Sequence, residues 1–357
     1  MRGTLLLAVV LTIGALPAAT GGASAKDGTG LIRNGVIVFT RNFPDRPDAP
    51  EASHLYAVNP TGGRVRPLVA SSGTDECCAA WSPAGSKLAF DRFGTNSPFT
   101  VVVSQADGSN AHEIAVGIRP VWSPGGREIA YTSSPSPGPT RIYLVRPNGT
   151  NKRRASSLGI VDARSPAWSP DGSRLAFNAE RTYPSPHFID VVGADGRTEH
   201  RLATVGASTS GPAWSPDGRL IAFSTENDRY TKLLVASSDG KTTRTLLKRS
   251  TPSLNSIDAI GWAGNGKTIA FAAATGLGSQ SPFSVYVVRA SGRGFKRVRR
   301  QAFDPSWSPD GRELVFPTFY RRTNNTALEV VNSQGKLLRW IDVSPWNDSE
   351  PAWQPRR

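Results

Sequence analysis

The sequence is poor in the side chains on which many enzymes and metal proteins depend. Its 357 residues include two cysteines, one methionine and four histidines. The G-x-S-x-G segment that carries the nucleophile of α/β-hydrolases is missing. We therefore expect no cofactor, no metal and no recognisable set of catalytic residues. The histidines, which are spread over the chain without a ligand spacing, are His54, His112, His187 and His200.

Apolar runs long enough to cross a bilayer are missing too. A membrane-spanning helix needs roughly 20 apolar residues, and the run Leu5–Leu16 has 12. Arg2 stands before this run and Ala23-Ser24-Ala25 follows it, which is typical of a secretory signal peptide. We interpret residues 1–25 as a signal peptide. Residues 26–357 are then expected in the periplasm or outside the cell, with no transmembrane segment.

Acidic side chains are outnumbered by basic ones, 28 to 42, so the net charge is +14. Basic groups recur in segments that we expect on the outer rim, where they would attract anionic envelope polymers or lipid head groups. The alternative is a soluble, arginine-rich surface without a ligand, and export argues against nucleic acid. The groups are Lys152-Arg153-Arg154, Lys248-Arg249, Lys296–Arg300 and Arg321-Arg322.

What the sequence does contain is a repeat. Seven tryptophans share one local context and follow one another at intervals of 41, 46, 46, 48, 45 and 46 residues. After each of the first six, a glycine stands at the fourth position and an aromatic residue at the ninth. Periods of 20–50 residues are typical of repeat architectures. The tryptophans are Trp81, Trp122, Trp168, Trp214, Trp262, Trp307 and Trp353.

Each repeat predicts four antiparallel strands. The tryptophan lies on a short first strand, and Ser-Pro-Asp-Gly then forms a turn because proline presets φ and glycine accepts a positive φ. The branched and aromatic run that follows predicts a second strand. A third strand such as Arg141–Val145, a second glycine turn and a polar fourth strand such as Thr243–Leu247 complete the unit. Such a unit is a propeller blade.

The two ends of the chain together supply one further blade. Gly35–Thr40, His54–Val58 and Val65–Val69 read as second, third and fourth strands whose first strand is missing. The segment Glu350–Arg357 reads as a first strand without its partners. We predict an all-β, seven-bladed propeller in residues 26–357, closed by pairing of these ends, which removes the exposed sheet edges. A six-bladed ring with an irregular first segment is the alternative.

The phrases at Pro166–Ala179 and Pro212–Thr225, PAWSPDGSRLAFNA and PAWSPDGRLIAFST, resemble the WD-like repeat of the TolB-type propellers of the bacterial envelope. The resemblance covers nearly all of residues 26–357 and implies the fold. TolB itself has an additional α/β domain and six blades, so the resemblance is to a propeller-only, exported member. It does not carry over the role of TolB as a whole.

The residues just before each tryptophan are expected at the mouth of the central channel, where loops on a rigid scaffold usually carry function. They form a mixed acidic and basic ring, which favours a partner or ligand site there. A solvated rim without a ligand is the alternative. The predicted partner-binding residues are Asp75, Glu76, Cys78, Arg119, Arg164, Asp258, Asp304 and Glu350.

The only cysteines, Cys77 and Cys78, are adjacent. Thiols of exported proteins tend to pair, but adjacent Cα atoms lie about 3.8 Å apart and disulfides prefer about 4.4–6.8 Å. The two interpretations are a strained vicinal disulfide and two free or separately used thiols.

Two functions follow from these features. The first is a non-catalytic, monomeric binding scaffold outside the cytoplasm that engages a protein or peptide at the channel mouth. The alternative is a propeller lyase or hydrolase that acts on an anionic polysaccharide through acidic and arginine side chains at the same mouth.

Ring closure by the chain ends makes a testable prediction. Burial of one tryptophan removes about 150–250 Å² from water, which at about 25 cal/mol/Å² stabilises by roughly 4–6 kcal/mol as an upper bound. Deletion of Glu350–Arg357 is therefore expected to lower the melting temperature sharply. An unchanged calorimetric transition would contradict closure by this segment.

Overall fold

The computed structural model describes residues 33–43, 52–69, 71, 73–94, 97–133, 138–182, 187–206, 210–227, 229–250, 254, 256–275, 282–320, 325–342 and 345–356. Within these ranges the regular structure is entirely β-strand. No helix long and apolar enough to cross a membrane occurs in the same ranges. The predicted signal peptide and the basic pair Arg321-Arg322 lie outside the described residues.

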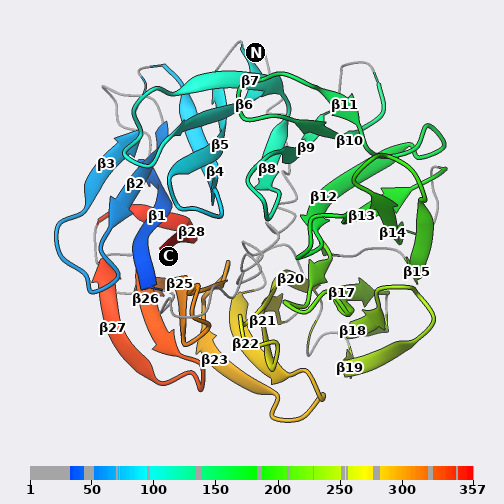
Figure 1. Cartoon of the computed structure of the whole chain (residues 1–357). Coiled ribbons are helices and arrows are strands. Elements are labelled where there is room, and N and C mark those ends of the chain that lie inside the picture. The colour runs from blue at the N-terminus through cyan, green and yellow to red at the C-terminus, as the bar shows by residue number, and fades with distance from the viewer. Residues whose placement is uncertain are drawn as a thin grey trace, which may run out of the picture.

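The strands form seven sheets of four antiparallel strands each, arranged around a central axis (Figure 1). This confirms the all-β, seven-bladed prediction, and the six-bladed alternative is wrong. Blades 1 to 3 consist of β28 (Asn347–Arg356), β1 (Arg33–Phe43), β2 (Ala52–Val58) and β3 (Arg66–Val69); β4 (Asp75–Trp81), β5 (Lys87–Gly94), β6 (Ser97–Gln105) and β7 (His112–Val116); and β8 (Ile118–Trp122), β9 (Ile129–Ser133), β10 (Arg141–Val145) and β11 (Arg153–Arg154).

The other four blades follow in chain order. Blades 4 and 5 consist of β12 (Asp162–Trp168), β13 (Arg174–Glu180), β14 (His187–Gly193) and β15 (His200–Gly206); and β16 (Ala213–Trp214), β17 (Leu220–Glu226), β18 (Tyr230–Ser237) and β19 (Thr243–Ser250). Blades 6 and 7 consist of β20 (Ser256–Trp262), β21 (Thr268–Ala274), β22 (Phe283–Arg289) and β23 (Lys296–Arg300); and β24 (Ser306–Trp307), β25 (Glu313–Tyr320), β26 (Asn325–Asn332) and β27 (Leu337–Asp342).

Composition changes from the inner to the outer strand of a blade. The first strand lies nearest the axis and the fourth lies at the periphery, as β8 and β15 show in Figure 1. Both faces of a middle strand are covered by neighbouring blades, so β21 (TIAFAAA) is buried at six of its seven positions. The outer strand β23 (KRVRR) has no buried residue, which puts its charge on the rim.

In five blades the turn after the tryptophan is held by a serine. In blade 4 the Ser169 hydroxyl accepts the Arg174 backbone N–H at 2.9 Å and donates to Asp171 at 2.6 Å. Gly172 closes the turn at φ 71°, in the left-handed region that glycine adopts without a steric cost. Asp171, Asp217 and Asp310 each accept a hydrogen bond from the serine two residues earlier and are therefore turn residues.

The seven tryptophans join neighbouring blades in a closed circle of hydrogen bonds. Each indole N–H donates to the backbone carbonyl of the residue that precedes the tryptophan of the preceding blade. The bonds are 3.0–3.2 Å long and run from Trp81 to Ala352, Trp122 to Ala80, Trp168 to Val121, Trp214 to Ala167, Trp262 to Ala213, Trp307 to Gly261 and Trp353 to Ser306.

Blade 1 closes the ring by pairing β28 with β1. Trp353 lies opposite Ile37 in the antiparallel register, which confirms the predicted pairing of the chain ends. The buried Arg41 and Asp348 form a bidentate ion pair across these two strands, with contacts of 2.8 and 3.0 Å. Gln354 occupies the position of the turn serines, and its side-chain oxygen accepts the Val36 N–H at 3.2 Å. The amide thus replaces the serine where the turn is interrupted.

The closing blade also packs on both neighbours. Ile37, Phe39 and Trp353 share an apolar cluster with Val315, Leu328 and Val330 of blade 7. Val38 and Ala352 lie in a second cluster with Trp81, Phe90 and Val102 of blade 2. The circle is therefore continuous in its apolar core as well as in its hydrogen bonds.

The substitution Trp353→Phe tests whether the circle is closed. The substitution keeps an aromatic side chain but removes the indole N–H that the Ser306 carbonyl accepts. A buried acceptor without a partner costs about 1–3 kcal/mol. Trp214→Phe removes the equivalent bond inside the continuous chain and is the matched control. We expect similar losses in the free energy of unfolding by urea titration. A much smaller loss at Trp353 would contradict closure.

Candidate functional site at the centre of the ring

The position three residues before each tryptophan has an unusual backbone. The six non-glycine residues at this position have φ between 42° and 61°, a backbone region that residues other than glycine rarely adopt. In blades 2, 3, 4 and 6 a β-bulge interrupts the ladder at this point. Bulges redirect side chains and recur next to functional sites. The seven residues are Cys78, Arg119, Ser165, Gly211, Ala259, Asp304 and Glu350.

Three carboxylates bind the backbone N–H groups of this position in the following blade. Glu350 of blade 1 accepts the Cys78 N–H of blade 2 at 3.0 Å. Asp91 of β5 accepts the Arg119 N–H of blade 3 at 2.8 and 3.0 Å. Asp304 of blade 7 accepts the N–H of Glu350. These bonds link blades 7, 1, 2 and 3 near the axis, next to the point of ring closure.

Seven side chains near the axis lie close enough for their charges to affect one another, and we call these seven residues the central cluster. They come from five blades: Glu350 from blade 1, three residues from blade 2, and one each from blades 3, 6 and 7. The cluster has four carboxyl groups and one base, whereas the chain as a whole has a net charge of +14. Its members are Cys77, Cys78, Asp91, Arg119, Asp258, Asp304 and Glu350.

Burial in this acidic surrounding favours protonated acids. It raises the pKa of Asp91 to about 8, against the lowering effect of the Arg119 N–H, and the Glu350 charge adds to the rise. Burial raises the pKa of Asp304 to about 7, and the charges of Glu350 and Asp258 contribute. An added positive charge would favour the ionised form of both carboxyl groups.

The pKa values of the two thiols are raised as well. The hydrogen bond with Cys78 lowers the pKa of Cys77, but burial and the charges of Glu350 and Asp91 outweigh it and bring that pKa to about 12. The same hydrogen bond and burial raise the pKa of Cys78 well above its ordinary value. Both thiols are free in the structure, and the vicinal disulfide stays a prediction.

The predicted mouth residues divide into two groups. Cys78, Arg119, Asp258, Asp304 and Glu350 belong to the central cluster. The remaining three have partners elsewhere, as described next.

Asp75 and Glu76 connect blade 2 to β2 of blade 1. Asp75 accepts the Ser53 N–H at 2.6 Å. The fully buried Glu76 contacts His54 at 2.8 Å and Arg92 at 3.2 Å. Arg164, with a side chain 60% exposed, pairs with Asp162 at 2.7 Å.

Asp91 is the cluster member that the repeat pattern does not predict. It stands on the second strand, directly after the aromatic position occupied by Phe90. The only signal in the sequence is that an acidic residue directly follows the apolar run Leu88–Phe90. Its Cα lies opposite that of Cys77 across the β4–β5 ladder, which places it beside the inner strand.

Where they are described, the predicted basic groups lie on outer strands, except Lys152, which directly precedes β11. Arg153-Arg154 form β11, Lys248 and Arg249 lie on β19, and Lys296–Arg300 form β23. A groove of about 770 Å³ beside β21 and β22 is lined by three basic side chains and no acidic one: Lys267, Arg289 and Lys296.

The fold and the repeat define the class of the protein as a seven-bladed, WD-like propeller. A family model described as the TolB beta propeller domain matches residues 91–357. The chain belongs to this TolB β-propeller family.

Three known proteins show how far the likeness extends. The protein TolB homolog of Chlorobium luteolum is 33% identical over 129 residues, which cover 36% of this chain and 29% of that relative. TolB from Acinetobacter baumannii has a TM-score of 0.55 at 18% identity, over 90% of this chain and 83% of that one. Oligogalacturonate lyase in complex with manganese has a TM-score of 0.60 at 13% identity, over 87% and 86%. The two solved structures show the fold alone.

The raised pKa of Asp304 predicts a dependence of stability on pH. A folded-state pKa of about 7 against 3.8 means that the contribution of this group is complete below pH 3.8 and is lost as the pH rises through 7. Asp304→Asn removes this loss and keeps a residue that tolerates positive φ. We expect the variant to gain on the wild type by up to about 1.4 kcal/mol per pH unit across this window, measured by urea unfolding.

Asp217→Asn is the control with the opposite sign. Burial raises the pKa of Asp217, but hydrogen bonds from Ser215 and the Arg219 N–H outweigh it and lower that pKa. This variant should lose stability relative to the wild type as the pH rises. Parallel pH profiles for Asp304→Asn and the wild type would contradict the assignment.

Proposed function

We propose that this protein is a non-catalytic TolB-like binding scaffold, exported to the periplasm or the cell exterior, that engages a protein or peptide partner at the mouth of its central channel. Membership of the TolB β-propeller family supports a binding role. The observation that carries the proposal is the central cluster. It holds four acids and one base in a chain that is otherwise basic, and two of the acids and the base stand on backbone positions with positive φ.

The chemistry of the cluster indicates the kind of partner. Two of its carboxyl groups have raised pKa values because burial and like charges disfavour their ionised forms. A lysine, an arginine or an amino terminus that enters the cluster would offset this cost. The partner segment is therefore basic. A basic segment would be repelled by the rim and attracted by the centre, which favours one mode of entry along the axis.

The enzymatic alternative is a lyase or hydrolase on an anionic polysaccharide. The likeness to oligogalacturonate lyase favours it at the level of the fold, and the groove beside Lys267, Arg289 and Lys296 offers positive charge to a polyanion. The central carboxylates would repel such a substrate, which places this function second. Turnover of uronate polymers by the purified protein would establish it.

Binding of defined peptides tests the scaffold proposal. A fluorescent lysine-rich peptide and an aspartate-rich peptide of the same length are titrated against the full chain, followed by anisotropy. The triple variant Asp258→Asn, Asp304→Asn, Glu350→Gln should weaken binding of the basic peptide about tenfold or more, which corresponds to about 1.4 kcal/mol.

A second triple variant is matched in charge. Asp107→Asn, Asp195→Asn and Asp239→Asn remove three exposed acids from outer turns and change the net charge equally. It should bind the basic peptide as the wild type does. Equal binding of both peptides, or equal losses in both triple variants, would contradict a site at the centre.

A further inference from the structure

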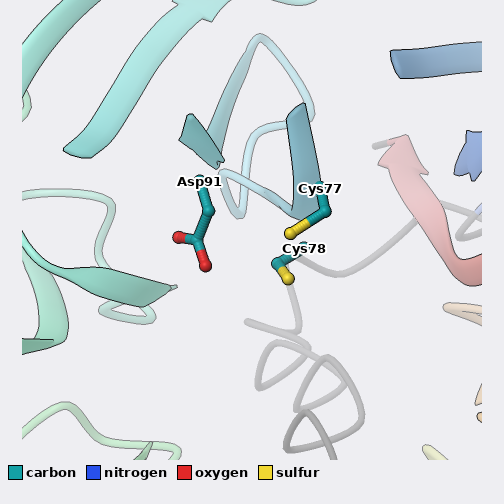
Figure 2. Close-up of side chains that lie close together, drawn as sticks. All are labelled: Cys77, Cys78 and Asp91. Atoms are coloured by element: carbon teal, nitrogen blue, oxygen red, sulfur yellow. The ribbon is translucent and has the colours of Figure 1, made fainter. Parts of the chain in front are cut away.

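The only two cysteines of the chain and the buried Asp91 form one compact group of metal-ligating atoms. Cys77 and Cys78 lie on the inner strand β4, and Asp91 lies on β5 directly opposite Cys77. The two Sγ atoms and a carboxylate oxygen all lie within 4.8 Å of one another. Figure 2 shows the three side chains converging from the two strands.

The irregular backbone explains why adjacent cysteines can converge. Consecutive side chains of a regular strand point to opposite faces, so two neighbouring thiols would normally be separated. Here the β4–β5 register shifts between Cys77 and Ala80, and Cys78 has φ 61°. A bulge of this kind redirects a side chain, and both sulfurs come to lie beside Asp91.

The donor set selects the metal. Two thiolates and one carboxylate suit Zn²⁺, which binds sulfur at about 2.3 Å and carboxylate oxygen at about 2.0–2.2 Å in tetrahedral geometry. Two sulfurs of such a site stand about 3.8 Å apart, within the spread of the three atoms here. We propose that Cys77, Cys78 and Asp91 form a Zn²⁺ site at the centre of the ring. This inference stands independently of the proposed partner.

The neighbouring groups are those that support a ligand set. The Arg119 N–H contacts both oxygens of Asp91, at 2.8 and 3.0 Å, and fixes the orientation of the carboxylate. Glu350 accepts the Cys78 N–H at 3.0 Å and the Cys78 thiol at 3.4 Å. Hydrogen bonds to ligands orient them and increase metal affinity. Glu350 can also accept the thiol proton when the metal binds.

Binding is an exchange of protons for the metal without redox change. Each S–H bond is replaced by a Zn–S bond, and the Asp91 O–H bond, where that carboxyl is protonated, is replaced by a Zn–O bond; one proton passes to Glu350 and the others to solvent. Three protein ligands leave the fourth tetrahedral position to water or to another ligand, an arrangement that is found in zinc sites open to ligands. Oxidation to a vicinal disulfide would remove both sulfur ligands, so the two fates of the thiols exclude each other.

Metal titration of the full chain tests the site. The reduced, chelator-treated protein is titrated with Co²⁺ in the absence of oxygen and then with Zn²⁺, and thiolate-to-cobalt charge transfer is followed by absorbance. We expect one Co²⁺ per chain, tetrahedral d–d bands, and displacement by one Zn²⁺. Cys77→Ser and Cys78→Ser should each abolish or strongly weaken the charge-transfer band. Asp91→Ala should weaken binding more than Glu350→Gln, which should cost about tenfold or more.

Asp239→Asn is the control, since it removes one acid from an exposed outer turn away from the central cluster. It should keep the cobalt spectrum, and thermal melts of all variants should show that they are folded. Absence of stoichiometric binding, or an unchanged spectrum in either serine variant, would overturn the proposal. So would a zinc-free protein, isolated without reductant, whose mass is that of the disulfide form.

Discussion

The circle of indole N–H bonds is the interaction on which the rest of the structure depends. Each tryptophan uses one apolar body to pack between blades and one donor to reach the preceding blade, so the same residue fixes both distance and orientation. Because the seven hydrogen bonds form a closed circle, every inner strand is fixed relative to the inner strands of both neighbouring blades. The positions three residues before each tryptophan are placed near the axis by the same bonds, and these positions supply most of the central cluster.

The distribution of charge follows the distance from the axis. Several outer strands carry arginine and lysine, as β11, β19 and β23 do. The inner positions carry carboxyl groups that accept N–H groups left free by the bulges, as Glu350 does for Cys78. The same acids therefore stabilise the joint between blades and set the charge of the centre. The proposed binding role does not compete with this structural role, since an acceptor with two oxygens can serve both.

The repeat was sufficient to predict the architecture because each repeated position has a recognisable structural role. The tryptophan packs between blades, and the glycine closes a turn. Trp353 and Ile37 could be paired from the sequence since every other blade shows the complete phrase. The centre was only partly predictable. Asp91 belongs to no repeated column, and Glu76 could not be distinguished from its neighbours until its contacts with His54 and Arg92 were known. The expectation of no metal considered the scattered histidines, and the convergence of Cys77, Cys78 and Asp91 depends on a bulge that the sequence does not mark.

The blade built from both ends of the chain has a consequence for biogenesis. Strand β1 is made first and must wait for β28, more than 300 residues later, before it has an inner neighbour. Contacts of such long sequence separation form slowly and expose unpaired edges in the meantime. A chain that is still emerging therefore remains an open arc, and its edge strands require protection until residues 347–356 arrive.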